Sequence, residues 1–502
     1  MERRPNILLI MADQLAPQFL PAYGHPVVLA PHIDRLAREG VTFESAYSNS
    51  PLCSPSRAAM MTGRLGSSTG VYDNAAEWPA SIPTFAHRLR DAGYRTCLAG
   101  KMHFVGPDQL HGFEERVTTD IYPADFGWTP SWDDPENRFE WWFHNMNAVT
   151  NAGIAEATNQ LDYDDEVGYQ AVRKLRDLAR IDDERPWMLT VSFTHPHDPY
   201  AVRQEYWDRY DHAGIDLPAV GPVPEEELDA HSRRLRHVSD MDSADISDYD
   251  VANARHAYYA AVSYIDDWVG KLMETLDGFG MADDTVVIFT ADHGDMLGER
   301  GLWYKMTFFE HSARIPLIVW APGQIEPRRV SEPVSLLDMS QTLADLSNSS
   351  PADDLEGSSL EPLLNGEAEP DRVVYGEYLG EGTVAPLLMV RKGSYKYVWC
   401  AEDPPQLFNL SADDHELVNL ADDPHSAAEL NELHALLERR WDPVAIQEAV
   451  LESQRRRRLV DRSLRKGEFV PWEYEPPSGA SDSYMRNHLD LNDLEHRRRY
   501  PR

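Results

Sequence analysis

The sequence predicts an α/β protein whose central sheet is covered by helices on both faces. Apolar strand patterns alternate with helix patterns along the chain, which is typical of this class. A chain of 502 residues is long enough for one large α/β domain with a smaller one appended. Because 42% of the residues are hydrophobic and thirteen are tryptophan, we expect a substantial core rather than a disordered chain.

The first elements can be read directly from the N-terminal residues. Residues 6–11 are a short apolar run that lacks a small-residue cleavage site and is followed at once by Asp13, so we interpret it as a buried parallel strand and not as a signal peptide. Residues 31–39 then predict a helix that ends at Gly40, and a strand is expected to start at 41–43.

Further helix-to-strand units follow. Ser81 is predicted to cap a helix that runs through Leu89, with Pro83 in its first turn. The next strand is expected at residues 94–99. Two more units of this kind are predicted to end in the strands 187–194 and 285–290.

Polar side chains follow four of the predicted strands, at the point where each strand ends. Ligands bind at the carboxyl ends of strands in open α/β sheets, so these groups are expected to form one site. The four runs are Asp13-Gln14, Lys101-Met102-His103, His195-Pro196-His197-Asp198-Pro199 and Asp292-His293-Gly294.

The charge and the cysteine content limit the partners and the compartment. The formal charge of −37 makes nucleic acid and anionic membranes poor partners, whereas a cationic substrate suits it. Three cysteines are too few for a disulfide framework, which fits a reducing compartment. No stretch has the roughly twenty apolar residues needed to span a bilayer. We therefore expect a cytoplasmic protein without a membrane partner.

The most specific motif is the run Cys53-Ser54-Pro55-Ser56-Arg57. Its pattern, Cys-x-Pro-x-Arg, is the substrate of an enzyme that oxidises the cysteine to formylglycine. Pro55 is favoured in the first turn of a helix, which is predicted to continue through Met61. The N-terminus of this helix would present backbone donors and positive potential to an anionic ester.

With this motif the chain resembles the sulfatase family of the alkaline-phosphatase-like superfamily. The resemblance implies a large mixed sheet sandwiched by helices, a smaller C-terminal antiparallel-sheet subdomain and an extended C-terminal tail. Residues 406–410 and 418–421 are similar to that subdomain, and residues 345–370 have the composition of a linker or surface crossing. The expected domains are 1–370, 371–450 and 451–502.

The resemblance also implies a nucleophile and a maturation partner. Cys53 would be converted to formylglycine by a formylglycine-generating enzyme. Hydration of the aldehyde gives a geminal diol, of which one hydroxyl attacks sulfur while loss of the other proton later expels sulfate. A serine could not use that second step.

A sulfate ester needs its negative charge neutralised, and a hard divalent cation held by carboxylates does this. By the resemblance the ligands would be Asp13, Gln14, Cys53, Asp292 and His293, although His293 departs from the family, in which many members carry Asn at this position. The family favours Ca²⁺, whereas a histidine ligand is better suited to Mn²⁺, Mg²⁺ or another transition ion. The Asp-His pairing resembles choline sulfatases and phosphonate monoester hydrolases.

The remaining catalytic roles follow the family by position. Arg57 would pair with the diol, and Lys101 and Lys305 would bind sulfate. His103 would be the base of the second step. The leaving alkoxide needs an acid, which is either His197 or Lys305. Asn74 is a further candidate contact to sulfate.

Two regions resemble the choline sulfatases, a branch of this family. The first is the aromatic insertion at 126–128, continued by Trp141, Trp142 and Phe143, from which Trp128, His144 and Asn145 would line the substrate site. Aromatic faces bind a quaternary ammonium well, and Glu381 matches the family's carboxylate. The second region is the tail, with the runs 471–476 and 484–487. In the branch this extension packs across a neighbouring subunit, so we expect a homo-oligomer, a dimer or tetramer, and we interpret Arg455–Arg458 as a solvated helix face or an intersubunit contact.

The predicted activity is hydrolysis of choline O-sulfate to choline and sulfate. A phosphonate monoester or phosphodiester hydrolase, or another alkyl or aryl sulfatase, is the alternative on the same scaffold. A noncatalytic choline-binding protein with unconverted Cys53 is the alternative from another class, and the intact set of catalytic residues argues against it.

Overall fold

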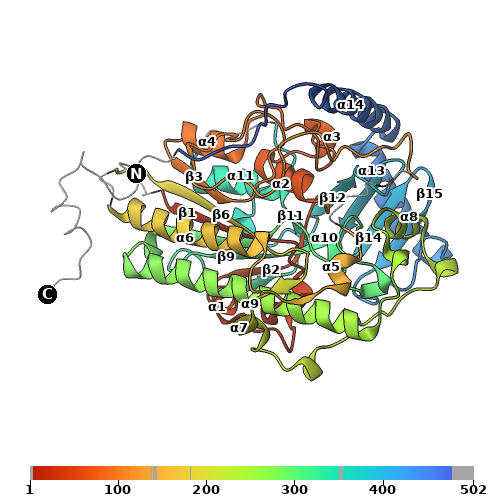
Figure 1. The fold of residues 1–502 in the computed structure, drawn as a ribbon, viewed down its shortest axis with the longest axis horizontal. Coiled ribbons are helices and arrows are strands. Elements are labelled where there is room, and N and C mark those ends of the chain that lie inside the picture. Colours follow the sequence, from red (N-terminus) through yellow and green to blue (C-terminus); the bar gives the residue numbers. More distant parts are fainter. Residues whose placement is uncertain (1–3, 137, 139–143, 181–182, 350–353, 478–502) are drawn as a thin grey trace.

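A large mixed sheet forms the centre of the molecule (Figure 1). The computed structural model describes residues 4–136, 138, 144–180, 183–349 and 354–477. In these residues the sheet runs in the order β10 (Arg328–Val330), β2 (Val41–Tyr47), β9 (Arg314–Trp320), β8 (Thr285–Ala291), β1 (Asn6–Asp13), β6 (Trp187–Pro196), β3 (Arg95–Gly100) and β4 (Glu115–Arg116), with β11 (Val334–Ser335) beside β2. Strand β9 is antiparallel to both of its neighbours, and the other pairs are parallel, which confirms the predicted α/β fold.

Strand β1 is the middle of this sheet and is buried from Ile7 to Asp13. An unbroken apolar run is expected of a parallel strand that is covered on both faces. Leu8 pairs with Leu189 of β6 on one side and with Val287 of β8 on the other. Because the three strands are parallel and in this register, their carboxyl ends meet at one edge of the sheet.

Helices cover both faces of the sheet (Figure 1). On one face α6 and α9 pack together with three shorter helices, and on the other α2, α4 and α11 pack together. The first group is α1 (Pro31–Glu39), α5 (Asn147–Thr150), α6 (Asn159–Arg180), α7 (Gln204–Trp207) and α9 (Asp248–Gly278). The second is α2 (Cys53–Thr62), α4 (Phe85–Asp91) and α11 (Leu337–Leu346). Shorter pieces are α3 (Gly66–Thr69), α8 (Ala230–Val238), α10 (Glu310–Ala313), α12 (Glu361–Leu364) and the paired strands β5 (Gly153–Ile154) and β7 (Ala201–Val202).

The C-terminal part contains the predicted antiparallel sheet with a helix packed on it. Its strands are β12 (Val373–Tyr378), β13 (Leu387–Lys392), β14 (Tyr395–Cys400) and β15 (Asp403–Asn409), each antiparallel to the next. Helix α13 (Ala427–Arg440) packs on β13 and β14, and α14 (Pro443–Leu464) follows it. One continuous helix therefore passes residue 450, where the subdomain was expected to end.

Two expectations about local structure were wrong. Helix α4 is capped by Thr84 and not by Ser81, because the Thr84 hydroxyl accepts from the backbone N–H of His87. The helix starts at Phe85, so Pro83 lies before its cap and not in its first turn. Residues 345–370 are also more than a linker, since α12 buries Leu363 and Leu364.

Some predicted features fall outside the described residues. They are Trp141, Trp142 and Phe143 of the aromatic insertion and the tail run 484–487. Among the residues that are described, no helix combines the length and apolar composition required to cross a membrane.

Candidate active site

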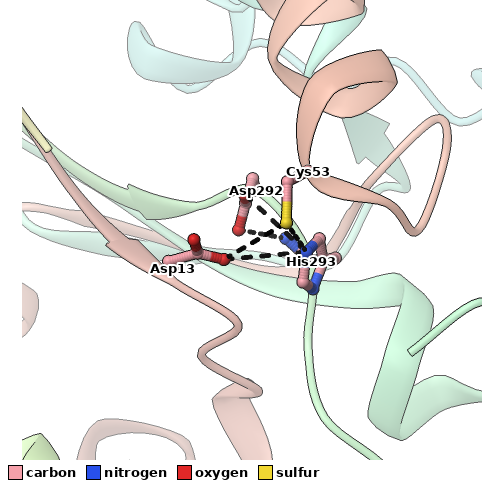
Figure 2. A group of neighbouring side chains, drawn as sticks. All are labelled: Asp13, Cys53, Asp292 and His293. Carbon is pink, nitrogen blue, oxygen red and sulfur yellow. Dashed lines mark hydrogen bonds and ion pairs between the residues drawn. The ribbon is translucent and has the colours of Figure 1, made fainter. Parts of the chain in front are cut away.

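Four buried side chains meet at the carboxyl edge of the central strands (Figure 2). They are Asp13 at the end of β1, Cys53 at the start of α2, and Asp292 and His293 directly after β8. One ligand atom from each lies within 4.8 Å of the others. Cys53 Sγ is 3.3 Å from His293 Nε2 and 3.8 Å from Asp13 Oδ1. The structure thus brings together four of the five predicted metal ligands.

Helix α2 presents Cys53 to this group from its N-terminus. The helix starts at Cys53 itself, and all ten of its residues are buried. Gly63 has a φ of 66° and ends the helix in the left-handed region that suits glycine. The N-terminal end of the helix, with its positive potential, therefore lies at the site, while the backbone N–H of Ser54 donates to Asn74 and that of Ser56 to the Leu52 carbonyl.

Arg57 contacts the two carboxylates of the cluster, those of Asp292 and Asp13. Its Nε donates to Asp292 Oδ2 at 2.8 Å, and its Nη2 lies 3.6 Å from Asp13 Oδ2. Its Nη1 donates to the carbonyl of Lys101 and to the Ser192 hydroxyl, at 2.7 and 2.8 Å. Sequence reasoning missed these partners, because they come from four separate strands, β1, β3, β6 and β8, or from the residues that directly follow them.

Lys101 reaches the same group from the end of β3. Its Nζ forms an ion pair with Asp13 and lies 4.2 Å from the centre of the Tyr122 ring. Gly100, at φ 106°, makes this approach possible, because a Cβ there would be 2.0 Å from the Ser192 carbonyl oxygen. Lys101 therefore lies at the cluster with Asp13 as its partner, and its role in binding sulfate stays a prediction.

Burial and charge act against each other on the ionisable groups of this cluster. Burial raises the pKa of the Cys53 thiol, but Lys101, Lys305 and His293 outweigh it and hold the pKa well below the ordinary value. Burial and the neighbouring Asp292 raise the pKa of Asp13. Burial also opposes ionisation of Asp292, but Arg57 and then His293 hold the pKa of that carboxyl below its usual range.

The donor set fits a divalent cation. His293 Nδ1 lies 3.0 Å from the Gly294 carbonyl oxygen, so Nδ1 carries the proton and Nε2 has its lone pair directed at the cluster. A backbone carbonyl commonly fixes a metal-binding histidine in this way. Two carboxylates and an imidazole, fully buried, are suitable ligands for such an ion.

Gln14 lies beside this cluster but is turned away from it. Its amide oxygen accepts from Lys305 Nζ at 2.6 Å, and its amide nitrogen donates to Asp295 Oδ2 at 2.7 Å. Its backbone N–H donates to Asp292 Oδ1 at 3.1 Å. Gln14 therefore orients Lys305 and Asp292, and its role as a ligand stays a prediction.

Lys305 and His197, the two candidates for the acid, contact each other. Lys305 Nζ is 2.7 Å from His197 Nε2, and His197 Nδ1 is 2.6 Å from the Asp198 carbonyl oxygen. Asp198 is also 3.3 Å from His144 Nδ1. Burial raises the pKa of Asp198, but His197 and then His144 outweigh it and bring it below the usual range. Sequence reasoning missed Asp198, although it stands in the singled-out run 195–199.

The predicted substrate residues differ in how they reach the site. His144 stacks against Tyr304 with ring centroids 4.7 Å apart, and burial lowers its pKa to about 4. The Asn145 side chain accepts from the backbone N–H of Asn147 at 3.0 Å, and its carbonyl oxygen accepts from the Tyr304 hydroxyl at 2.7 Å. Asn145 therefore holds the start of α5 in addition to any role toward substrate.

His103 and Trp128 lie on the side of Cys53. The two rings meet edge to face, with centroids 5.8 Å apart. Among the described residues neither ring nitrogen of His103 has a hydrogen-bond partner of normal geometry. Burial lowers the pKa of His103, and the neighbouring Cys53 opposes that shift. Burial thus favours the neutral imidazole, and the role of His103 as the base of the second step stays a prediction.

Glu381 is a buried carboxylate near the nucleophile. It is 5% exposed, and its Oε1 has no hydrogen-bond partner among the described residues. Burial raises its pKa to about 8; Asp73 adds to this effect, and the positive charge of Lys305 opposes it. Such a group is costly unless a cation joins it.

The Asn74 side chain contacts the backbone of helix α2. Its Oδ1 accepts from the backbone N–H of Ser54 at 2.9 Å, so it satisfies a donor in the first turn of α2. The neighbouring Asp73 forms an ion pair with Arg457, which is buried. The interpretation of the arginine run as a solvated face was therefore wrong for Arg457, because its guanidinium turns inward to this carboxylate.

Comparison with known proteins agrees with this geometry. The family model described as Sulfatase matches residues 5–349, the one described as choline sulfatase enzyme C terminal matches residues 448–500, and the one described as N-sulphoglucosamine sulphohydrolase, C-terminal, matches residues 298–442. The chain is 50% identical to the choline-sulfatase of Rhizobium meliloti (strain 1021), over 99% of both chains. It is 27% identical to the arylsulfatase of Clostridium perfringens (strain 13 / Type A), over 86% of this chain and 94% of that one.

Solved structures share the fold. The phosphonate monoester hydrolase of Agrobacterium radiobacter matches with a TM-score of 0.69 and 25% identity, over 89% of this chain and 96% of that one. The phosphonate monoester hydrolase SpPMH from Silicibacter pomeroyi matches with a TM-score of 0.70 and 24% identity, over 87% and 94%. The alkaline-phosphatase-like architecture is therefore confirmed. The Sulfatase family model covers more than half of the chain, and the relative from Rhizobium meliloti is 50% identical to it over 99% of its length. This chain therefore belongs to the sulfatase family.

Proposed function

We propose that this sulfatase hydrolyses choline O-sulfate to choline and sulfate. The observation that carries the proposal is Glu381, a buried acidic side chain whose Oε1 has no hydrogen-bond partner among the described residues and whose pKa is influenced by Lys305 and Cys53. The trimethylammonium group has no N–H to donate, so it is recognised by negative charge and by aromatic faces. Trp128, with its edge to His103, is suited to supply such a face. The match to a choline-sulfatase along the whole chain supports the same substrate.

The sulfate end of the substrate would meet positive charge and hydrogen-bond donors. Lys101 and Lys305 would bind the sulfate oxygens, and the N-terminus of α2 adds positive potential. Lys305 and His197 share a hydrogen bond, so we propose that together they protonate the leaving alkoxide. An acid in this position typically contributes about 10²–10⁴-fold to the rate. His103 is proposed as the base that restores the nucleophile.

We propose that Asp13, Gln14, Asp292, His293 and the group at position 53 hold one divalent cation, calcium by family and manganese or magnesium as alternatives. When bound, the ion supplies positive charge to the ester and lowers the pKa of the nucleophilic hydroxyl. Formylglycine at position 53, made by a formylglycine-generating enzyme, would supply a nucleophile that can later be regenerated. Arg57 keeps the two carboxylates oriented.

Two further properties are proposals of the same kind. The three cysteines are unpaired and buried, which supports a reducing, cytoplasmic location. Val444, Leu459 and Val470 are exposed apolar side chains on α14 and the segment after it, which supports a homo-oligomer, a dimer or tetramer.

A phosphonate monoester hydrolase is the second candidate, because solved structures of that class share the fold along most of the chain. Relative rates separate the two. We expect kcat/KM for choline sulfate to exceed that for a phenyl phosphonate ester and for 4-nitrophenyl sulfate. A preference for the phosphonate ester would overturn the proposal.

The first measurement is the mass of the peptide that contains Cys53, from protein expressed in its native host. We expect the mass of the aldehyde in place of the thiol. An unmodified cysteine in an enzyme that still turns over sulfate esters would overturn the formylglycine assignment. The kinetic comparison should then use the same preparation, so that the maturation state is known.

A further inference from the structure

The C-terminal helix α14 reaches toward the active site through one residue, Arg457. It is only 4% exposed, whereas Arg455 on the same helix has a side chain that is 60% exposed. Figure 1 shows α14 at the edge of the molecule, close to α3. The helix thus directs one charge of an otherwise exposed run into the interior.

All three nitrogens of the Arg457 guanidinium donate hydrogen bonds. Its Nη1 and Nη2 donate to the two carboxylate oxygens of Asp73 at 2.8 and 2.7 Å. Nη1 also donates to the Thr129 hydroxyl at 3.2 Å, and Nε donates to Ser453 at 3.1 Å. A two-oxygen contact of this kind fixes orientation as well as distance. Arg457 therefore joins two loops that are distant in sequence.

Each of these loops leads to a residue of the site. Asp73 precedes Asn74, whose side chain accepts from the Ser54 backbone next to the nucleophile. Asp73 Oδ1 also accepts from the backbone N–H of Ala75 at 2.9 Å, which holds the turn around Asn74. On the other loop, Thr129 follows Trp128 and donates to the Phe126 carbonyl at 2.7 Å.

We propose that Arg457 is a positioning residue that fixes, from the C-terminal helix, both the Asp73-Asn74 turn at the nucleophile and the Trp128-Thr129 turn of the aromatic wall. Neither the metal cluster nor the sulfate-binding lysines involve it. The part that concerns Trp128 rests on the proposed choline sulfate activity, and the part that concerns Asn74 holds for any sulfate ester.

A fork-shaped guanidinium is needed for this contact. A lysine keeps the charge but cannot bind both oxygens of Asp73 and the Thr129 hydroxyl in one plane. We therefore expect Arg457→Lys to retain the fold and to lose part of the positioning, and Arg457→Met to lose all of it. Arg455→Met is the matched control, because Arg455 also binds a carboxylate, Asp133, but does so on the surface.

The test compares two substrates under conditions in which circular dichroism shows every variant to be folded. Misplacing reacting groups by a fraction of an ångström lowers turnover, so Arg457→Met should lower kcat by about 10- to 100-fold on both choline sulfate and 4-nitrophenyl sulfate. The KM for choline sulfate should also rise by about 3- to 10-fold, because only this substrate brings a quaternary ammonium to the aromatic wall. Arg457→Lys should lie between, and Arg455→Met should match the parent enzyme.

Hydrogen exchange gives a readout that does not depend on activity. Peptides that span 53–57 and 126–129 should exchange faster in Arg457→Met and not in Arg455→Met. The proposal would be overturned if Arg457→Met lowered the melting temperature but left kcat, the KM for both substrates and the exchange rates of the two peptides unchanged. If the parent enzyme ignores choline sulfate, the proposed function fails, and the 4-nitrophenyl sulfate turnover and the exchange data still decide the role of Arg457.

Discussion

The two buried acidic regions of the site differ in what balances their charge. At the nucleophile, Asp292 is bound by Arg57, and Asp13 pairs with Lys101. Glu381 has no comparable partner among the described residues, and one of its oxygens is unpaired. The chain thus supplies its own cations to Asp13 and Asp292, whereas at Glu381 it supplies none among the described residues, and we propose that the ammonium of the substrate takes that place.

Replacing the nucleophile should have the largest effect and should leave both charged regions in place. Cys53→Ala is expected to lower turnover of every sulfate ester by about 10⁴-fold or more, since the rest of the site cannot form the covalent intermediate. Steady-state assays measure the loss, and circular dichroism should show an unchanged fold. Residual activity close to that of the parent would mean that another group attacks sulfur.

Removing Arg57 tests the compensated region. Arg57→Ala leaves the buried Asp292 carboxylate without its arginine and leaves Asp13 with Lys101 alone, and we expect a loss of about 3–5 kcal/mol in the free energy of unfolding. Denaturant unfolding after metal chelation measures it, and added calcium should recover part of the loss because it binds only the folded state. Arg185→Ala, which removes an exposed ion pair, is the control and should change stability by less than about 1 kcal/mol. Equal losses in the two variants would show that the buried carboxylates do not need Arg57.

Glu381→Gln tests the uncompensated region. The substitution keeps the shape and removes the charge, so kcat/KM for choline sulfate should fall by about 10- to 100-fold, the equivalent of one close charge interaction in a partly screened site. The value for 4-nitrophenyl sulfate, which has no ammonium, should change little. Equal losses on the two substrates would remove Glu381 from the cation site.

The ionisation of Glu381 gives the smallest and most specific effect. Burial raises its pKa to about 8, with Asp73 and Cys53 adding to the shift and Lys305 opposing it. The carboxylate therefore forms as pH rises through about 8, and only the carboxylate attracts the ammonium. The ratio of kcat/KM for choline sulfate to that for 4-nitrophenyl sulfate should rise, by up to about 10-fold, between pH 7 and 9. The ratio should be flat in Glu381→Gln, and a flat ratio in the parent enzyme would contradict the prediction.

The sequence was sufficient to predict the residues at the strand ends. Asp13, Lys101, His197 and Asp292 each follow an apolar strand, and the carboxyl ends of neighbouring strands meet. The small antiparallel sheet was also expected, from the resemblance of residues 406–410 and 418–421 to the C-terminal subdomain of the family. Local pattern and strand geometry are enough for the residues at the strand ends.

What could not be predicted depends on contacts between distant segments. Asp73 and Arg457 are 384 residues apart, and no local pattern indicates that one arginine of a charged run turns inward. The partners of Arg57 likewise come from β1, β3, β6 and β8 or from the residues that directly follow them, and their identity depends on strand order. Asp198 was within a singled-out run, but its role depends on the two histidines that face it.

The complete burial of Cys53 sets a time limit on its conversion. In the folded protein the residue lies at the start of a buried helix, 1% exposed, where no modifying enzyme could bind the surrounding run in extended form. Strand β8, which completes the cluster with Asp292, is made about 240 residues after Cys53; at about 5–20 residues per second this takes roughly 10–50 s. Any enzyme that oxidises Cys53 therefore has to meet the growing chain within that interval or keep it unfolded afterwards. Yield of active protein should accordingly depend on the rate of translation relative to the supply of that enzyme.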